Sequence, residues 1–171
     1  MPAEPTLTPT SFMVLGLLRA IGEPCTPYDL KRAHGMSVGY FWTLPHSQLY
    51  AEPPRLAKGG YVTEQREEGG RRRRLFSLTA KGGAALDAWL AEPADKLPEL
   101  RDMALLKVFY GGDMSAVAER QLAAHEERLG RYEALHADLA LATDAPPGPI
   151  TTLEAGIAYE RTMIEYWRSL L

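Results

Sequence analysis

The chain has 171 residues, 46% of them hydrophobic, which is enough for one compact domain or two small ones. Its single cysteine, Cys25, excludes an internal disulfide and is typical of a reducing compartment. The net charge of −3 argues against a general binder of nucleic acids. The sequence shows neither the basic start of a signal peptide nor an apolar run that could span a membrane, so we expect a cytoplasmic protein without membrane contact.

The charge is divided unevenly along the chain. Residues 1–92 carry 11 basic and 9 acidic side chains, a net charge of +2, whereas residues 93–171 carry 8 basic and 13 acidic side chains, a net charge of −5. This asymmetry predicts a polyanionic partner for the first part and a different role for the second.

Two helices are predicted at the start of the chain. The first covers residues 7–21, with Thr8 as its cap, and ends at Gly22. The second begins at Pro27, which needs no amide hydrogen in the first turn, and closes at Gly35. A connector dense in aromatic residues follows over residues 38–45. We expect its aromatic rings to pack in the core or in a turn, and the alternative is a ligand site.

A third helix is predicted over residues 47–58 and stops at Gly59-Gly60. Leu49 and Leu56 lie seven residues apart, which places them on one helical stripe. Pro53-Pro54 removes two amide hydrogens inside this helix, at roughly 3 kcal/mol for an interior proline. We therefore expect a kink there, or two tilted turns.

Two short strands follow this helix and indicate a β-hairpin. They cover residues 61–66 and 72–78, and the glycine-containing segment 67–71 reverses the chain between them. A helix followed by a hairpin that carries arginines is the outline of a winged helix. The helix would enter the major groove of DNA and the hairpin would reach the neighbouring phosphates.

Four consecutive arginines stand on the second arm of the hairpin. Alternation along a strand directs Arg71 and Arg73 to one face, and Arg72 and Arg74 to the other, which they share with Phe76. A solvated run of charge is the alternative explanation. Because the run follows a recognition-type helix, we expect at least one pair of these arginines to bind phosphates.

Long helices are predicted after residue 79, with a domain boundary at Pro93. Residues 79–92 form a capped helix, and the apolar pattern of residues 98–110 predicts a buried one. Residues 115–142 carry apolar side chains at alternating spacings of three and four, the seam of a helix pair. A last helix is expected to begin with the capping box of Thr151.

We assign dimerisation to the seams of the last two helices, because the C-terminal part is too short to cover every apolar stripe. The residues assigned are Leu122, His125, Leu129, Tyr132, His136, Leu139, Ile157, Ile164 and Trp167. The two histidines lie within the stripe, so we expect both to be at least partly buried.

The sequence offers no pattern for catalysis, for a cofactor or for a metal. It lacks the HExxH arrangement, the nucleophile elbow and the phosphate-binding glycine loops, and one cysteine gives no zinc pattern. We therefore expect a binding protein and not an enzyme.

Several motifs together resemble the PadR-like transcriptional regulators, the phenolic-acid-responsive repressor family. The family's opening helices are matched by VLGLLRAIGEPCTPYDLKRA, with Tyr28 and Leu30 on its Gly-Tyr-x-Leu segment, where Pro27 replaces the glycine. Its recognition helix is matched by FWTLPHSQLYAEPPRLAKGGYV, and its second wing strand by RRRRLFSLTAKG. The resemblance implies a dimeric winged-helix repressor whose C-terminal helices carry dimerisation and sometimes bind an effector.

The predicted fold is mainly α with a small β-hairpin: an N-terminal winged helix-turn-helix domain (residues 1–92) and a C-terminal α-helical dimerisation domain (residues 93–171). The predicted partners are double-stranded DNA, a second copy of the chain and a small aromatic effector. The alternatives are a winged-helix module that binds protein, and a ligand-sequestering protein, both without DNA binding.

Each predicted site has its own residues. Gln48 is expected to pair with adenine and Arg55 with guanine. The remaining expected DNA contacts, mostly to phosphate, are Tyr28, Ser47, Tyr50, Lys58, Arg71, Arg72, Arg73 and Arg74. A cavity for the effector between subunits is expected to be lined by Met103, Phe109, Tyr110, Tyr159, Tyr166 and Trp167. The alternative for this aromatic set is a plain dimer core.

Overall fold

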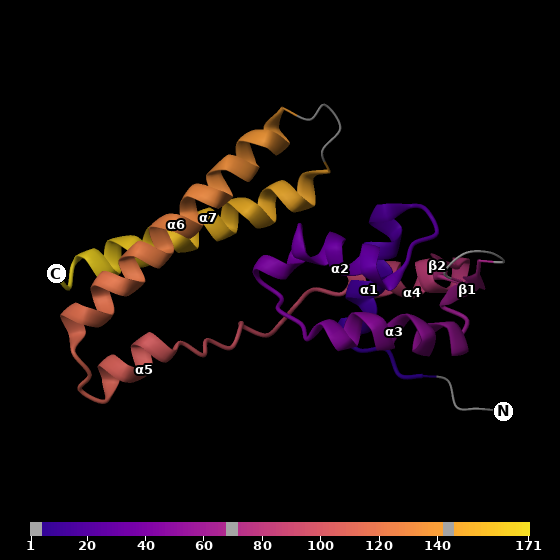
Figure 1. The fold of residues 1–171 in the computed structure, drawn as a ribbon, viewed down its shortest axis with the longest axis horizontal. Helices are drawn as coiled ribbons and strands as arrows, with labels where there is room; N and C mark the ends of the chain where they lie inside the picture. The colour runs from indigo at the N-terminus through magenta and orange to yellow at the C-terminus, as the bar shows by residue number, and fades with distance from the viewer. Residues whose placement is uncertain (1–4, 68–71, 142–145) are drawn as a thin grey trace. The chain divides into compact units, whose positions relative to one another are not determined.

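The computed structural model describes residues 5–67, 72–141 and 146–171, and the chain divides into two compact units, Met1–Lys96 and Leu97–Leu171. The elements of the first unit are α1 (Pro9–Ile21), α2 (Pro27–Gly35), the short 3-10 helix η1 (Val38–Tyr40), α3 (His46–Lys58), β1 (Val62–Arg66), β2 (Arg74–Leu78) and α4 (Ala80–Ala91). Those of the second are α5 (Met103–Phe109), α6 (Met114–Ala140) and α7 (Pro147–Arg168) (Figure 1).

Side-chain caps start the helices of the first unit where the sequence predicts them. Thr8 and Thr26 each form a capping box, with Ser11 and Asp29 as their partners. Gly22 ends α1 with a φ of 72°, a left-handed backbone that glycine adopts without strain. The predicted caps and the predicted ends of both helices are confirmed, whereas α1 begins at Pro9, two residues after the predicted start.

α3 runs through both prolines as one helix, so the expectation of two separate turns is wrong. The reason lies in packing. The Pro53 ring is fully buried together with Leu49 and Leu56, and this burial offsets the lost backbone hydrogen bonds.

The core of the first unit lies between α1, α2, α3, α4 and the hairpin. β1 pairs antiparallel with β2, and Val62 faces Leu78. On its other side β2 exchanges two backbone hydrogen bonds between Phe76 and Cys25, of 3.0 and 2.9 Å. α4 packs so closely on the hairpin that a Cβ at Gly82 would lie 2.0 Å from the carbonyl oxygen of Tyr61. These contacts hold the hairpin rigidly beside α3.

The aromatic connector is not part of this core, and the expectation that its rings pack inside is wrong. Tyr40, Phe41 and Trp42 are all exposed. The buried positions around α2 and α3 are already filled by leucines, including Leu30 and Leu49.

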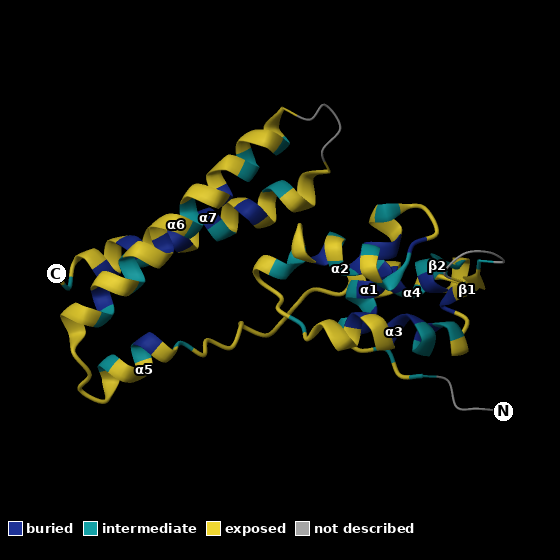
Figure 2. Cartoon of the chain, in the orientation of Figure 1, coloured by how far each residue is buried: buried dark blue, intermediate teal, exposed yellow. Residues whose placement is uncertain are grey.

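The second unit is built on an antiparallel hairpin of α6 and α7 (Figure 1). Two apolar clusters form its seam, one around Trp167 and Ala118 and the other around Tyr132 and Ile157. In Figure 2 the buried positions of the two helices lie along the line where the helices meet. α7 begins at Pro147, before Thr151, so the predicted capping box is wrong: a proline in the first turn already starts the helix.

The seam residues assigned to dimerisation pack inside one chain, which corrects their assignment to a subunit interface. Tyr132, Ile164 and Trp167 are at most 7% exposed, because they lie between α6 and α7 of the same chain. The same hairpin seam holds the other assigned residues as buried or half-buried side chains: Leu122, His125, Leu129, His136, Leu139 and Ile157. These side chains therefore stabilise the helix hairpin of the single chain.

α5 is shorter and more exposed than the buried helix predicted over residues 98–110. It has seven residues, and of these only Ala104 is buried (Figure 2). Met103 and Phe109 are 65% and 80% exposed. α5 packs against α6 and contributes Ala104 to the apolar cluster around Trp167.

A buried hydrogen bond between His125 and Glu160 crosses the α6–α7 seam. His125 Nδ1 lies 2.5 Å from Glu160 Oε2, and Arg128 lies 3.4 Å from Glu160 Oε1. His125 and Glu160 are 4% and 1% exposed. The expectation that both stripe histidines are at least partly buried is confirmed, since the side chain of His136 is 36% exposed.

We predict that His125→Leu destabilises the protein by about 3 kcal/mol, because it leaves the Glu160 carboxylate buried with only a longer contact to Arg128. The double variant His125→Leu, Glu160→Leu should regain most of this loss, since two apolar side chains can fill the same space. Urea unfolding measures both. His136→Leu is the matched control and should change stability by less than about 0.5 kcal/mol. Equal effects of the two single variants would contradict the prediction.

Candidate nucleic-acid interface

The solvent face of α3 is free of negative charge. Ser47, Tyr50 and Lys58 are exposed on it, together with His46 and Gln48. The only carboxylate in α3, Glu52, is buried on the opposite face. This face can therefore approach a polyanion without charge repulsion.

Arg55 points away from this face and ties α3 to the rest of the unit. Its guanidinium donates to both carboxylate oxygens of Glu52, at 2.9 and 2.5 Å, to Ser11 Oγ at 2.7 Å and to the carbonyl oxygen of Thr6 at 2.9 Å. Ser11 Oγ in turn donates to Glu52 at 2.6 Å. These bonds already occupy the guanidinium, so this structure does not support the assignment of Arg55 to guanine.

Gln48 lies at the edge between the two faces. It is exposed, and its Oε1 lies 3.4 Å from the Thr10 hydroxyl of α1, which is a weak contact. Unlike Arg55, Gln48 can turn toward a base at little cost. Tyr28, at the start of α2, is 62% exposed.

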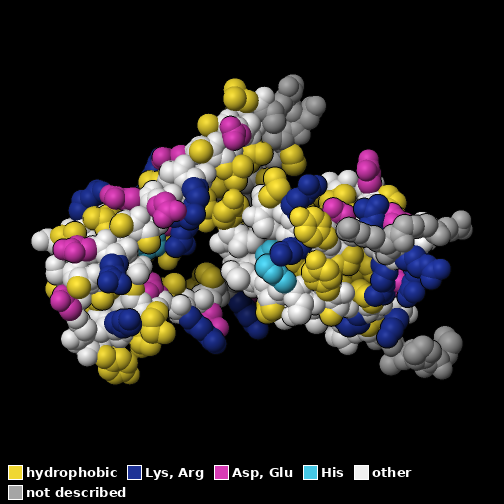
Figure 3. Space-filling view, in the orientation of Figure 1, with side chains coloured by type: hydrophobic (Ala, Val, Ile, Leu, Met, Phe, Trp, Pro, Cys, Tyr) yellow, Lys and Arg dark blue, Asp and Glu magenta, His cyan; other side chains and the backbone are white. Residues whose placement is uncertain are grey.

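The hairpin presents a row of arginines that are partly neutralised by carboxylates on the same hairpin. Arg74 binds Glu64 through two bonds of 2.7 Å, and Arg73 binds Glu67 through bonds of 2.9 and 2.8 Å. Arg74 also lies over the Phe76 ring at 5.4 Å, as strand alternation predicts. Figure 3 shows Lys and Arg side chains gathered at the end of this unit where the hairpin lies.

The two remaining arginines of the run are Arg71 and Arg72. Arg72 is exposed and has a φ of 47°, an uncommon backbone for a residue other than glycine. Arg71 lies outside the described residues. The structure thus places Lys58 of α3 and the arginines of the hairpin in the same unit. Arg55 instead binds groups inside this unit.

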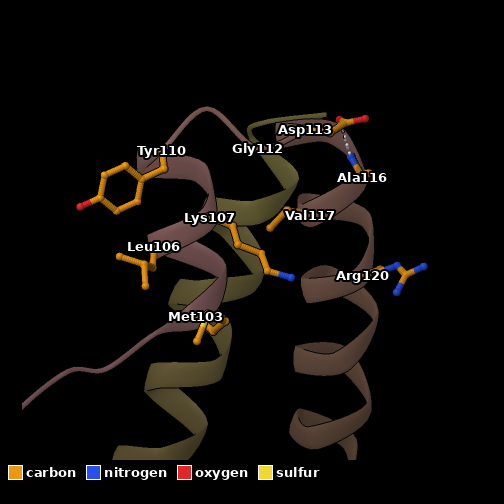
Figure 4. Close-up of a pocket in the computed structure, with 9 residues that line it drawn as sticks. All are labelled: Met103, Leu106, Lys107, Tyr110, Gly112, Asp113, Ala116, Val117 and Arg120. Carbon is orange, nitrogen blue, oxygen red and sulfur yellow. Dashed lines mark hydrogen bonds between the residues drawn. The ribbon is translucent and has the colours of Figure 1, made fainter.

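The residues predicted to line an effector cavity do not form one cavity in a single chain. Met103 and Tyr110 line an open groove of about 590 Å³ between α5 and α6, with Lys107 and Arg120 at its edge (Figure 4). The four other predicted residues are not among the groove's lining: Phe109, Tyr159, Tyr166 and Trp167. Trp167 is fully buried, and its indole Nε1 has no hydrogen-bond partner among the described residues.

The described part of the chain shows neither a membrane span nor a cluster of metal ligands. No helix there has the length and the apolar character that crossing a membrane requires. Over the same residues, no group of three or more His, Cys, Asp or Glu side chains could hold a metal ion.

A helix whose exposed face carries no carboxylate, next to a two-stranded wing, is the arrangement of a winged-helix protein. Residues 14–88 match the transcriptional regulator PadR-like family, and residues 100–171 match the C-terminal domain family of the virulence activator alpha type. The N-terminal part of the chain is thus similar to the PadR-like family, whose members are transcriptional regulators.

Similar proteins match the whole length of the chain. The negative transcriptional regulator PadR of Bacillus subtilis is 26% identical, over 94% of this chain and 94% of its own. The crystal structure of that PadR in complex with operator DNA superposes with a TM-score of 0.81 at 22% identity, over 94% and 95% of the two chains. Its complex with p-coumaric acid gives a TM-score of 0.73 at 20% identity, over 96% of each chain.

We predict that the Glu52 cluster makes stability depend on acid pH. Burial raises the pKa of Glu52, but hydrogen bonds from Arg55 and Ser11 outweigh it and hold the pKa below the usual 4.5. The unfolded chain therefore binds this proton more readily, so the cluster's contribution is complete above about pH 4.5 and is lost as the pH falls further.

Glu52→Gln should remove this dependence together with about 1–3 kcal/mol of stability at pH 7, because a charge-assisted pair is lost. Urea unfolding at steps between pH 7 and pH 3 measures it, and the wild-type curve should approach that of the variant in acid. Glu119→Gln, at an exposed carboxylate of α6, is the control. Parallel wild-type and Glu52→Gln curves across this range would count against the prediction.

Proposed function

We propose that this regulator is a homodimeric repressor that binds a roughly palindromic operator and is released by a small aromatic effector. The observation that carries the DNA-binding part is the composition of α3. Its exposed face offers hydroxyl, amide and ammonium groups and no carboxylate, and it stands beside an arginine-bearing hairpin. Hydroxyl and cationic groups bind phosphates, and an amide can read a base edge.

In this proposal α3 enters the major groove, and Gln48 reads a base edge there. Ser47, Tyr50 and Lys58 bind phosphates around the groove, and the wing arginines bind the neighbouring backbone. Two copies related by a two-fold axis would place their α3 helices about 34–36 Å apart, one turn of duplex DNA. The assignment of repression and of operator binding is supported by the similar PadR, a negative regulator whose structure with operator DNA is known.

The dimer part of the proposal rests on apolar surface that a single chain leaves uncovered. α5 exposes Met103, Leu106 and Phe109, and a seven-residue helix is too short to be stable on its own. A second copy of the chain would cover it. The effector part is supported by the complex of PadR with p-coumaric acid, an aromatic acid.

One experiment tests all three parts. DNA fragments selected from the source genome should include a palindromic site that the protein retards in a mobility-shift assay, and light scattering should give the mass of a dimer. p-Coumaric acid and related phenolic acids, added at increasing concentration, should release this DNA. The proposal fails if no fragment is selected above background. A complex that forms but ignores every aromatic acid would remove the effector part alone.

We predict that removing the wing arginines weakens binding to all DNA sequences, because phosphate contacts carry no sequence information. If each subunit loses one or two phosphate contacts, the slope of log K against log salt should flatten by roughly 2 to 4 units. The test variant replaces three arginines by alanine: Arg72, Arg73 and Arg74.

A matched control replaces three exposed arginines of the second unit that also pair with glutamates: Arg131, Arg161 and Arg168. It removes the same charge away from the proposed interface and should leave the salt slope close to that of the wild type. Equal slopes for both triple variants would exclude the wing from the DNA interface.

A further inference from the structure

The connector between α2 and α3, residues 36–45, exposes large apolar side chains directly before the helix that we assign to the groove. Met36, Phe41 and Trp42 are 70%, 61% and 45% exposed. Large apolar side chains that are exposed together on one segment often mark a contact surface. The winged-helix function described above does not use them.

This segment is held in one conformation although its side chains face solvent. The buried His34 ring bonds through Nε2 to the carbonyl oxygen of Trp42, at 2.9 Å. The Trp42 amide donates to the carbonyl oxygen of Val38 at 2.8 Å, and Ser37 Oγ donates to that of Ala33 at 2.6 Å. Gly39 lies so close to His34 that a Cβ would stand 2.7 Å from the His34 carbonyl oxygen. A surface fixed in advance loses little conformational entropy on binding.

The charge around the connector identifies the kind of partner. Residues 30–51 contain no Asp or Glu, and no other acid-free run in the chain is as long, although 22 of the 171 residues are acidic. The same run contains Lys31, Arg32 and two histidines. A segment of this charge is complementary to a polyanion, and it includes the exposed residues at the start of α3.

We infer that the connector is a second DNA-contacting surface, in which Phe41 and Trp42 lie against the sugar–phosphate backbone beside the base pairs approached by α3. Deoxyribose presents apolar carbons that an aromatic ring can cover, and the indole N–H of Trp42 can donate to a phosphate oxygen. This inference rests on the proposed function. It adds an uncharged contact to an interface otherwise made of cations and hydrogen-bonding groups, and it gives His34 the part of a positioning residue.

The test uses the full-length protein and a duplex containing the selected operator with several flanking base pairs on each side. Phe41→Ala, Trp42→Ala should weaken binding by about tenfold or more, as fluorescence anisotropy measures it. The slope of log K against log salt should stay as in the wild type, because neither side chain carries a charge. Leu90→Ala is the matched control: Leu90 belongs to the same unit and is 60% exposed. It should bind as the wild type does.

Three outcomes separate the explanations. A double variant that binds the operator as tightly as the wild type overturns the inference and leaves the proposed function in place. A double variant whose mass in light scattering falls to that of a monomer also overturns it, because the connector would then contact a second copy of the chain. A wild-type protein that binds no DNA at all overturns both, and the wild-type titration alone identifies this case.

Discussion

The Arg55 guanidinium binds a buried carboxylate, a buried hydroxyl and a backbone carbonyl at once, and this one side chain fixes α3 to α1. Glu52 and Ser11 are almost completely removed from solvent, so each needs its partner inside the protein. Because α3 is held from its inner face, its outer face can present polar groups at defined positions without help from a ligand. The two prolines in α3 are tolerated for the same reason, since packing and not the backbone ladder determines where the helix lies.

The hairpin depends on a similar arrangement of charges, but at the surface. Arg73 and Arg74 are paired with Glu67 and Glu64, so the wing carries less free positive charge than its sequence suggests. Exposed ion pairs of this kind contribute little to stability, and a phosphate can compete for the same guanidinium groups. Ion pairs with its own carboxylates therefore stabilise the conformation of the wing in the absence of a partner.

The second unit is held together by the seam between two long helices. α6 and α7 bury their apolar stripes against each other, and a His125–Glu160 pair lies in the middle of the seam. A buried pair of this kind adds little stability over apolar side chains, but it fixes which residues face each other along two long helices. With these stripes already used, the apolar side chains that remain exposed in the unit include Met103, Leu106 and Phe109 of α5.

The sequence by itself determined the N-terminal helices, the hairpin and the similarity to PadR-like regulators. Some features depend only on neighbouring residues: helix caps such as Thr8 and Thr26, the glycines that end helices, and the arginine run. Such features can be identified from the sequence alone. It did not determine which side of a helix faces inward. Arg55 was expected to face DNA because arginines commonly bind guanine, yet the burial of Glu52 turned it to the core. The apolar stripe of α6 packs against α7 of the same chain. The aromatic rings of the connector lie outside the core, because leucines already fill it. Only the tertiary structure decides these cases, because the free energy of burying a side chain depends on neighbours that are distant in sequence.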